Sequence, residues 1–495
     1  MERQKKGQKN KKNRGFLPAS IPQAILLIVM LLVEMLLIAL VLALDVLPGN
    51  IFAAIIALMI VIDVVIFGLS GGQKSKSKRG IAGICLCGIM ILGSIAGAYY
   101  VTDTYKTLEA ISSQTEQTVQ YDVIVLKDSA YENLEDIYGA TVYTVAGGGS
   151  ALEKAKTSLE TDASVLFEEC TGCMGTGEKV YSLSGTKQDN ILLMSHAEYG
   201  MADDIIEGFK DETKVIHKIR FKVESAGGPV ADVTLMPFNI LISGIDTRGE
   251  ISDVARSDVN MILTVNPRTN TVLLTSMPRD SYVPLHMNGE MDKLTHSGVY
   301  GIDETIKTIE DWLNIDINYY ARVDFEMLVK LIDAVGGVDV YNDIDFYSSV
   351  KGWHYKKGWH HMGGRYALWF VRERKTFEDE DEQRIRNQQK VMKALLKEFT
   401  SKKTLLMNYT DILEAVQDDM QTNMSRKEMA ALVKMQLDEM PQWDIQRQWV
   451  DGDDAYRGTW SMGFGRELFV SIPKEESVKK VSRKIDRVMY PNKED

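Results

Sequence analysis

Three near-continuous apolar stretches occupy the first hundred residues, and each is long enough to cross a bilayer. They are Ile21–Leu44, Ile51–Leu69 and Ile81–Val101. At a rise of about 1.5 Å per residue, a helix of roughly 20 residues spans the hydrocarbon layer of a membrane. A cleaved signal peptide is the alternative for the first stretch, but this stretch is longer than the apolar core of a signal peptide. The sequence therefore predicts three retained transmembrane helices in residues 21–101.

Basic residues lie on only one side of these stretches. Seven Lys and Arg precede the first stretch and four lie in the loop after the second, whereas the turn Asp45–Asn50 has none. Lys and Arg mark the cytoplasmic side of membrane proteins. We therefore expect a multi-pass protein of the cell membrane with a basic cytoplasmic N-terminus at residues 1–20. Everything after Val101 is expected outside the cell, in an envelope of the Gram-positive type.

The part expected outside the cell is strongly acidic. Residues 1–101 hold 11 Lys and Arg against 4 Asp and Glu, so they carry +7 of a total charge of −12, and the remaining residues carry −19. Nucleic-acid binding draws most of its affinity from Lys and Arg on phosphates. The composition therefore excludes general nucleic-acid binding, and any anionic ligand needs a local basic site.

The chain after the third span divides into three segments. Residues 102–120 are polar and contain no Pro or Gly, which predicts a stalk helix that continues the span. Residues 121–228 show the pattern of a small α/β accessory domain, and residues 229–495 follow as a second domain with a C-terminal extension. In the accessory domain a helix is expected to open at Ser150–Thr157, and the expected strands are Tyr121–Leu126, Thr141–Val145, Ile191–Met194 and Val215–Val223.

A predicted hairpin in the second domain brings an acid and a guanidinium together. The strands Val259–Val265 and Thr271–Met277 flank a turn centred on Arg268-Thr269. If those two residues form the loop, residues whose numbers sum to 537 face each other, so Asp258 stands opposite Arg279. The preceding apolar strand Phe238–Ile245 runs into Asp246, which predicts a charged site at one end of the sheet.

A second cluster of charge follows later in the domain. Leu368–Arg374 is predicted as a strand, in which Arg372 and Arg374 project from the same face. Asp381–Phe399 is predicted as a helix that carries Gln388 on its apolar stripe. Surface salt bridges for the arginines and one structural hydrogen bond for Gln388 are the alternatives to a binding site.

These segments together resemble the LytR-CpsA-Psr family of cell-wall ligases, over roughly Met236–Phe399. The resemblance rests on motifs in order, although Asn387 stands where many members have a second Arg. The motifs are Asn239–Arg248, Arg256-Ser257-Asp258, Pro278-Arg279-Asp280, Asp292-Lys293, Val335–Val340, Ala367–Arg374, and Arg384 with Gln388-Gln389. The three spans and the inserted α/β segment resemble the capsule-type branch. The expected fold class is α/β, with an α/β/α catalytic domain built on a central mixed sheet.

The resemblance implies a reaction and a set of site residues. Members transfer a glycosyl-phosphate from a polyprenyl-pyrophosphate carrier to a peptidoglycan hydroxyl, as in capsule or teichoic acid attachment. Asp246 and Asp258 are then the expected ligands of Mg²⁺, with Mn²⁺ as the alternative ion. Arg279, Asp258 and Asp280 are the expected catalytic residues, with the general base unassigned. The expected pyrophosphate ligands are Arg256, Arg279, Arg372, Arg374 and Gln388.

Two further expectations concern the rest of the domain. The helix Asp303–Leu313 and the stripe within Asp324–Val335 are candidates to line an apolar groove for the lipid. The tail after Pro441, with a strand at Leu468–Ile472 and a basic helix at Val478–Val488, is expected to dock on the catalytic domain. Two other functions stay open from the sequence: a pyrophosphatase that hydrolyses the same lipid-linked glycan, and a membrane-anchored envelope sensor or attenuator.

Overall fold

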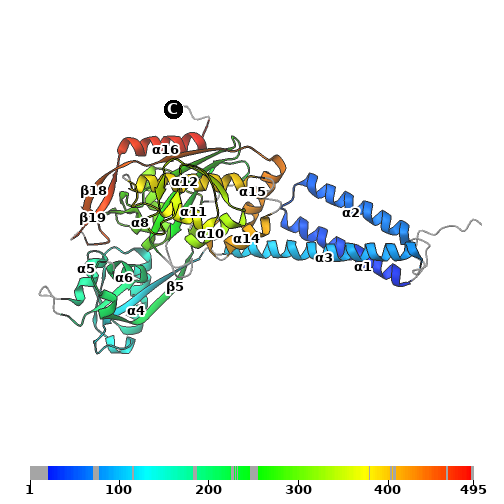
Figure 1. Ribbon diagram of the computed structural model, residues 1–495. Coiled ribbons are helices and arrows are strands. Elements are labelled where there is room, and N and C mark those ends of the chain that lie inside the picture. Colours follow the sequence, from blue (N-terminus) through cyan, green and yellow to red (C-terminus); the bar gives the residue numbers. More distant parts are fainter. Residues whose placement is uncertain are drawn as a thin grey trace, which may run out of the picture. The chain divides into compact units, whose positions relative to one another are not determined.

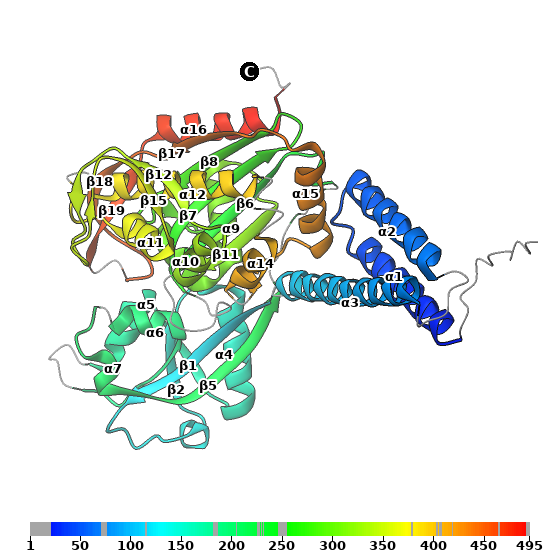
Figure 2. The same ribbon diagram turned by 45° about the vertical axis from the view of Figure 1, so that its right-hand side comes forward.

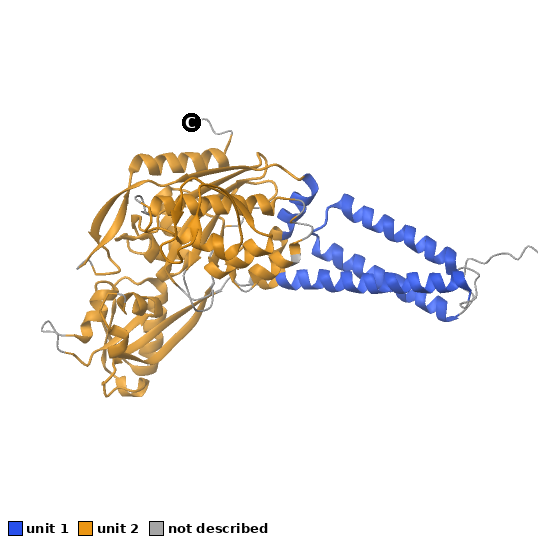
Figure 3. Ribbon diagram, viewed as in Figure 1, with its two compact units in different colours: residues 1–107, 430–439 blue, residues 108–429, 440–495 orange. Residues whose placement is uncertain are grey.

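The structure is a computed structural model, and its contacts divide the chain into two compact units. The first comprises Met1–Thr107 with Ala430–Glu439, and the second Leu108–Met429 with Met440–Asp495 (Figure 3). The residues described are 21–70, 77–113, 116–181, 187–203, 205–224, 228, 230, 232–245, 255–377, 380–401, 404, 408–417, 419–463 and 466–491. The predicted metal ligand Asp246 lies outside the described residues.

The first unit contains the three predicted apolar helices. They are α1 (Ile21–Leu44), α2 (Gly49–Ser70) and the first part of α3 (Lys78–Ser113), and all three are long and apolar enough to cross a membrane (Figure 1). The predicted stalk helix is right only as far as Ser113. Glu116–Gln120 begin strand β1, because Gln117 and Val119 point into the protein and the segment pairs with a second long strand.

A five-stranded sheet forms the smaller part of the second unit, in the order β3-β2-β4-β1-β5. Helix α4 (Gly149–Ala163) contributes to the core on one face, and α5 (Gly172–Gly177) and α6 (His196–Asp203) to the core on the other. The strands are β1 (Glu116–Leu126), β2 (Thr141–Val145), β3 (Leu166–Cys170), β4 (Ile191–Ser195) and β5 (Thr213–Glu224). The four predicted strands are confirmed. Strand β3 was not predicted, because it is an edge strand with Glu168 and Glu169 at its centre.

Both cores of the smaller sheet include residues from much later in the chain. Leu285 and Trp460 complete the core beside α4, and Val299 and Met462 complete the core on the other face. The backbone contact is equally close, since a Cβ on Gly172 would lie 2.3 Å from the carbonyl oxygen of Trp460. The smaller sheet therefore shares its hydrophobic interior with the rest of the second unit.

The larger part of the second unit is built on a mixed six-stranded sheet in the order β16-β11-β6-β7-β8-β17. Strand pairs β11–β6 and β8–β17 are parallel, and the other pairs are antiparallel. The predicted hairpin register is confirmed, because Asn260 pairs with Met277 and Asn266 with Thr271. The strands are β6 (Phe238–Ile245), β7 (Ser257–Asn266), β8 (Thr271–Met277), β11 (Tyr319–Asp324), β16 (Met420–Thr422) and β17 (Asp444–Trp449).

Helices cover both faces of this sheet, which confirms the predicted α/β/α architecture (Figure 2). Helices α9 (Ile302–Leu313) and α16 (Glu475–Met489) pack on one face, and α12 (Glu380–Phe399) packs on the other. The apolar side of α9 packs in this core. The tail docks as expected, since β17 extends the sheet and α16 covers it.

The predicted strand at Leu368–Arg374 is wrong, because the segment forms helix α11 (Gly364–Arg372). Its buried residues Gly364, Ala367, Leu368 and Val371 recur at helical spacing, which outweighs the strand preference of Trp and Val. Gly364 permits close packing on α10 (Phe325–Ala334), since a Cβ there would lie 2.2 Å from the carbonyl oxygen of Val329.

The remaining helices and strands connect these layers. They are α7 (Phe209–Glu212), β9 (Tyr282–Pro284), β10 (Met291–Lys293), α8 (Leu294–Ser297), β12 (Val338–Asn342), β13 (Phe346–Tyr347), β14 (His354–Tyr355), β15 (Gly358–Met362), α14 (Tyr409–Gln417), α15 (Arg426–Glu439), β18 (Gly452–Gly458) and β19 (Glu467–Pro473).

Candidate functional site

Charged side chains from five segments converge beyond the end of the β7–β8 hairpin. Asp258 lies near the start of β7, and Arg279 and Asp280 follow β8. Lys293 ends β10. Asp381 and Arg384 lie in the first turn of α12, and Arg374 lies in the loop between α11 and α12. We call these seven residues the charged cluster, which holds four cations and three carboxylates.

Arg279 lies at the centre of the charged cluster. Its Nη1 donates to Asp258 Oδ1 at 2.8 Å, and its Nε lies 3.5 Å from Asp280 Oδ2. This is the juxtaposition of Asp258 and Arg279 that the hairpin register predicts. The side chains of both residues retain between a fifth and a third of their exposure, so a ligand can reach them.

Lys293 and Asp280 form the most buried ion pair of the cluster. Lys293 Nζ donates to Asp280 Oδ1 at 2.9 Å, and only 5% of the Asp280 side chain is exposed. Burial by itself raises the pKa of Asp280, but the charges of Lys293 and Arg279 outweigh it and hold this pKa below its usual range. Asp280 is therefore ionised and serves to fix the two cations beside it.

The third carboxylate, Asp381, faces two guanidinium groups. Its Oδ1 lies 3.3 Å from Arg384 Nη2 and 3.8 Å from Arg374 Nη1. Burial, and to a lesser degree the charge of Asp280, raise the pKa of Asp381 above its usual value. Burial likewise lowers the pKa of Arg384, whose side chain is only 12% exposed.

Several polar atoms in the cluster are buried without a hydrogen-bond partner among the described residues. They are the Nε atoms of Arg279 and Arg384 and Oδ1 of Asp381. A buried guanidinium N–H without an acceptor is costly, so such groups point to a ligand that brings oxygen atoms. Phosphate oxygens match this need, because guanidinium groups bind them through paired charge-assisted hydrogen bonds.

Three other residues predicted to bind the pyrophosphate, Gln388, Arg256 and Arg372, lie outside the charged cluster. Gln388 is half-buried on α12, one turn beyond Arg384 and on the same side of the helix. Arg256 is exposed and lies two residues before Asp258, at the entry to β7. Arg372 does not share a face with Arg374 as predicted, because its guanidinium lies over the rings of Phe325 and Trp369, at 4.7 and 5.5 Å from their centroids.

The buried carboxylate of Glu373 separates these two arginines. It accepts hydrogen bonds from Ser349 N at 2.7 Å, Ser349 Oγ at 2.8 Å and Thr376 Oγ1 at 3.0 Å. These bonds overcome the effect of burial and hold the pKa of Glu373 below its usual value. Glu373 thus anchors the chain between Arg372 and Arg374, and directs Arg374 to Asp381.

The carboxylates of the cluster suit a hard divalent cation. No group of three or more His, Cys, Asp or Glu that could hold a metal occurs within the part of the chain that is described. Mg²⁺ needs only one or two carboxylates when phosphate oxygens and water complete its shell. Asp258 and Asp381 are carboxylates of this kind, so the residues present fit Mg²⁺ held together with a phosphate ligand.

Three residues of the charged cluster were not predicted as site residues, namely Lys293, Asp381 and Arg384. Lys293 and Arg384 belong to the motifs named above, but their spacing alone does not bring them to Arg279. Asp381, Arg384 and Gln388 are spaced at i, i+3 and i+7, so one face of α12 carries all three. That spacing was sufficient to add Asp381 and Arg384 to the site.

Comparison with known proteins assigns the chain to a family. The LytR_cpsA_psr family profile matches residues 200–479, more than half of the sequence. The chain belongs to the LytR-CpsA-Psr family. The matched residues contain all seven members of the charged cluster, as well as β6 to β19.

Several LytR-CpsA-Psr relatives match about half of this chain. The polyisoprenyl-teichoic acid–peptidoglycan teichoic acid transferase TagU of Bacillus anthracis is 37% identical over 225 residues, which cover 45% of this chain and 73% of that protein. The TagU of Enterococcus faecalis is 36% identical over 196 residues, covering 39% and 63%. Among solved structures, TagV of Bacillus subtilis is 29% identical, covers 51% of this chain and 97% of that chain, and has a TM-score of 0.43.

Proposed function

We propose that this protein is an extracytoplasmic phosphotransferase that attaches a glycopolymer to peptidoglycan. The donor is a polyprenyl-pyrophosphate-linked glycan, and the acceptor is a peptidoglycan hydroxyl. The observation that carries the proposal is the charged cluster, in which the buried Nε atoms of Arg279 and Arg384 have no hydrogen-bond acceptor among the described residues. The LytR-CpsA-Psr family and its TagU relatives, which are polyisoprenyl-teichoic acid–peptidoglycan teichoic acid transferases, support the same reaction.

In the proposed reaction the acceptor hydroxyl releases its proton, which ends in solvent, and its oxygen attacks the phosphorus that carries the glycan. The bond from this phosphorus to the bridging oxygen breaks, and polyprenyl phosphate leaves with that oxygen. Arg279, Arg384 and Lys293 neutralise charge on the pyrophosphate, which is the main demand of phosphoryl transfer. Asp280 is a positioning residue in this account, since it fixes Arg279 and Lys293.

Mg²⁺ is part of the proposal, with Mn²⁺ as the alternative ion. Asp258 is the expected ligand in the described part of the chain, and Asp246 is the second expected ligand. A bound Mg²⁺ supplies charge neutralisation for the phosphate oxygens and lowers the pKa of an oxygen that it binds. Arg256 and Arg374 lie at the edges of this region, where they can orient the outer phosphate oxygens.

The membrane part of the proposal follows from the charge pattern around the three apolar helices. With the N-terminus in the cytoplasm, the second unit lies outside, where lipid-linked glycans and peptidoglycan occur. An apolar lipid chain needs an apolar surface beside the charged cluster. The α12 face of the large sheet offers one, because Ile240, Ile242 and Val265 are only partly buried there. This face is the lipid site of the proposal.

The test is to incubate the purified full-length protein with a polyprenyl-pyrophosphate glycan, with and without a peptidoglycan fragment. The proposal expects a phosphate-linked glycan–peptidoglycan product and release of polyprenyl phosphate only when the fragment is present. Chelation of divalent cations should stop the reaction, and Mg²⁺ or Mn²⁺ should restore it. Release of glycan phosphate at the same rate without the fragment would contradict the proposal and establish a pyrophosphatase instead.

A further inference from the structure

A buried group of three polar side chains adjoins Lys293 of the charged cluster. It consists of Asp292, His296 and Ser461, and at most 4% of each residue is exposed. His296 Nδ1 lies 2.6 Å from Asp292 Oδ1 and 2.9 Å from Ser461 Oγ. Both contacts use the same ring nitrogen, so His296 cannot relay a proton through its ring from the serine to the aspartate. We call these three residues the buried polar group.

The carboxylate of Asp292 holds the buried polar group together. Its Oδ1 contacts His296 and accepts a hydrogen bond from the amide of Lys293 at 2.7 Å. Its Oδ2 accepts a hydrogen bond from the amide of Ser461, also at 2.7 Å. A buried amide that loses its acceptor is costly. Asp292 therefore fixes the backbone at the point where β10 passes into α8.

Helix α8 carries this constraint to the charged cluster. The amide of Thr295 donates to the carbonyl oxygen of Arg279 at 2.8 Å. The amide of Leu294 donates to the carbonyl oxygen of Ser281 at the same distance. Asp280 lies between these two carbonyl groups in the chain, and its carboxylate binds the ammonium group of the residue just before α8. The start of α8 therefore determines where the cations of this part of the cluster lie.

The smaller sheet reaches the buried polar group through α5. The amide of Cys173 donates to the carbonyl oxygen of Ser461 at 2.6 Å. Gly172, whose φ is +67°, lies so close that a Cβ there would be 2.7 Å from the same oxygen. Glycine is the residue that permits both this backbone conformation and so close an approach. Helix α5 therefore holds Ser461 in place.

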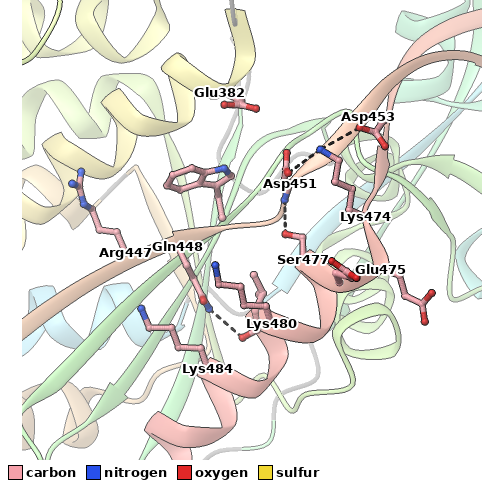
Figure 4. A pocket seen from close by; sticks show the side chains of 13 residues that line it. Glu382, Arg447, Gln448, Asp451, Asp453, Lys474, Glu475, Ser477, Lys480 and Lys484 are labelled. Atoms are coloured by element: carbon pink, nitrogen blue, oxygen red, sulfur yellow. Dashed lines mark hydrogen bonds and ion pairs between the residues drawn. The ribbon is translucent and has the colours of Figure 1, made fainter.

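The buried polar group differs from the exposed ion pairs at the edge of the large sheet. In the cavity between β17 and α16, Lys474 binds Asp451 and Asp453 at 2.9 and 3.2 Å (Figure 4). The exposed fraction of these side chains is 41% or more. Water screens such pairs, so their loss has little effect on the rest of the protein. Asp292 is fully buried, so its loss must be met by movement of the groups that it binds.

We propose that the buried polar group positions Lys293 and Arg279 for the transfer reaction. Asp292, His296 and Ser461 are then positioning residues, since their burial keeps them from the substrate. The inference rests on the proposed function, and it gives the smaller sheet a part in catalysis through the contact of α5 with Ser461. Because the two cations stabilise charge that develops in the transition state, their displacement lowers kcat more than it raises KM.

The test is a double-mutant cycle in the full-length protein between Asp292→Asn and Lys293→Met. An amide cannot accept all the N–H groups that the Asp292 carboxylate faces, so Asp292→Asn should lower kcat for transfer roughly ten- to a hundredfold, with KM within about threefold. In the Lys293→Met background the same substitution should cost at least about threefold less, because one of the groups that it displaces is already gone.

Two control variants and one substitute accompany the cycle. Asn266→Ala is the buried control, since Asn266 donates to the carbonyl oxygen of Val488 at 2.6 Å at the opposite end of the β7–β8 hairpin. Lys474→Gln is the exposed control. Both should keep kcat near that of the wild type. Ser461→Ala removes only the hydroxyl beside His296, and it takes the place of Asp292→Asn if that variant does not fold.

Binding of inorganic pyrophosphate in the presence of Mg²⁺ is the second readout, and it does not require transfer. Asp292→Asn should bind this probe roughly threefold more weakly than the wild type, and Asn266→Ala should bind it normally. Equal pyrophosphate binding by Asp292→Asn and the wild type, or an equal loss of kcat in both backgrounds, would overturn the inference. A wild type that transfers no glycan would refute the proposed function, and weaker binding by Asp292→Asn alone would still support the positioning role.

Discussion

At the scale of single residues, the account depends on the geometry of Arg279. This side chain directs two nitrogens at two carboxylates, with Nη1 on Asp258 and Nε close to Asp280. Arg279→Lys keeps the charge but loses the planar fork, so kcat/KM for transfer should fall roughly ten- to a hundredfold, as expected for the loss of one charge-assisted bond. Steady-state kinetics of transfer by the wild type and Arg279→Lys measure this change in kcat/KM. Arg483→Lys on exposed α16 is the control, and similar kcat/KM values in both variants would refute the clamp.

The ion pair of Asp280 with Lys293 predicts a dependence of stability on pH. A carboxyl whose pKa is lower in the folded state adds stability above its unfolded pKa of about 3.9, and this stability is lost as pH falls through the folded value. Asp280→Asn should therefore lower the free energy of unfolding at pH 7 by about 3 kcal/mol, since it leaves Lys293 without its carboxylate partner. Denaturation of both proteins at pH 7 and near pH 3 measures the difference. If the free energies of unfolding of the wild type and Asp280→Asn differ by the same amount at both pH values, the ionised Asp280 does not stabilise the fold through this ion pair.

At the scale of elements, sequence patterns predicted contacts within a hairpin better than contacts between distant segments. The pairing of Asp258 with Arg279 followed from the turn, because a short loop fixes the register of both strands. The junction of β8 with α12, which brings Arg384 and Asp381 to Arg279, depends on a chain of about a hundred residues between them. No local pattern fixes that distance, so the sequence indicated Arg384 only as part of a motif and Asp381 only as the start of a helix.

In helix α11 the local residue preferences predicted the wrong element, because tertiary packing decides its structure. Trp369, Phe370 and Val371 favour strands, yet tertiary packing of Gly364 and Ala367 against α10 decides for a helix. As a result, Arg372 and Arg374 are separated at the helix end. Their separate roles were not accessible from spacing alone.

The loop after α11 gives a prediction for Glu373. An amide cannot accept all the hydrogen bonds that this carboxylate receives, so Glu373→Gln should cost about 1–3 kcal/mol and displace Arg374 from Asp381. Hydrogen exchange should rise in residues 373–377, and kcat/KM should fall although no cluster residue has changed. Glu326→Gln, which removes an exposed pair with Arg365, is the control. Unchanged exchange in residues 373–377 would exclude this anchoring role.

At the scale of the whole molecule, the smaller sheet and the catalytic part of the second unit depend on each other. Trp460 fills the core beside α4, so Trp460→Ala should destabilise the protein by about 3–5 kcal/mol. Amide protection should decrease in both sheets together, as measured by hydrogen exchange. Trp359→Ala is the control, because 72% of Trp359 is exposed. Loss of protection in the large sheet alone would show that the two parts unfold independently.

The three apolar helices were the most predictable feature of the molecule, because length and apolar composition suffice to define a span. The shared interior of the second unit was not predictable. Leu285, Val299, Trp460 and Met462 look like ordinary core residues of their own segment, and nothing in the sequence indicates that they complete the cores of the sheet formed by β1 to β5.

The fate of the two donor phosphates distinguishes transfer of a glycosyl-phosphate from transfer of the glycan alone. Two donors are prepared, one labelled in the phosphate attached to the glycan and one in the phosphate attached to the lipid. Each donor is incubated with the full-length protein and a peptidoglycan fragment. The account predicts that the glycan-side label enters peptidoglycan while the lipid-side label leaves as polyprenyl phosphate. Recovery of both labels in released polyprenyl pyrophosphate would mean that the sugar–oxygen bond breaks, and would contradict the account.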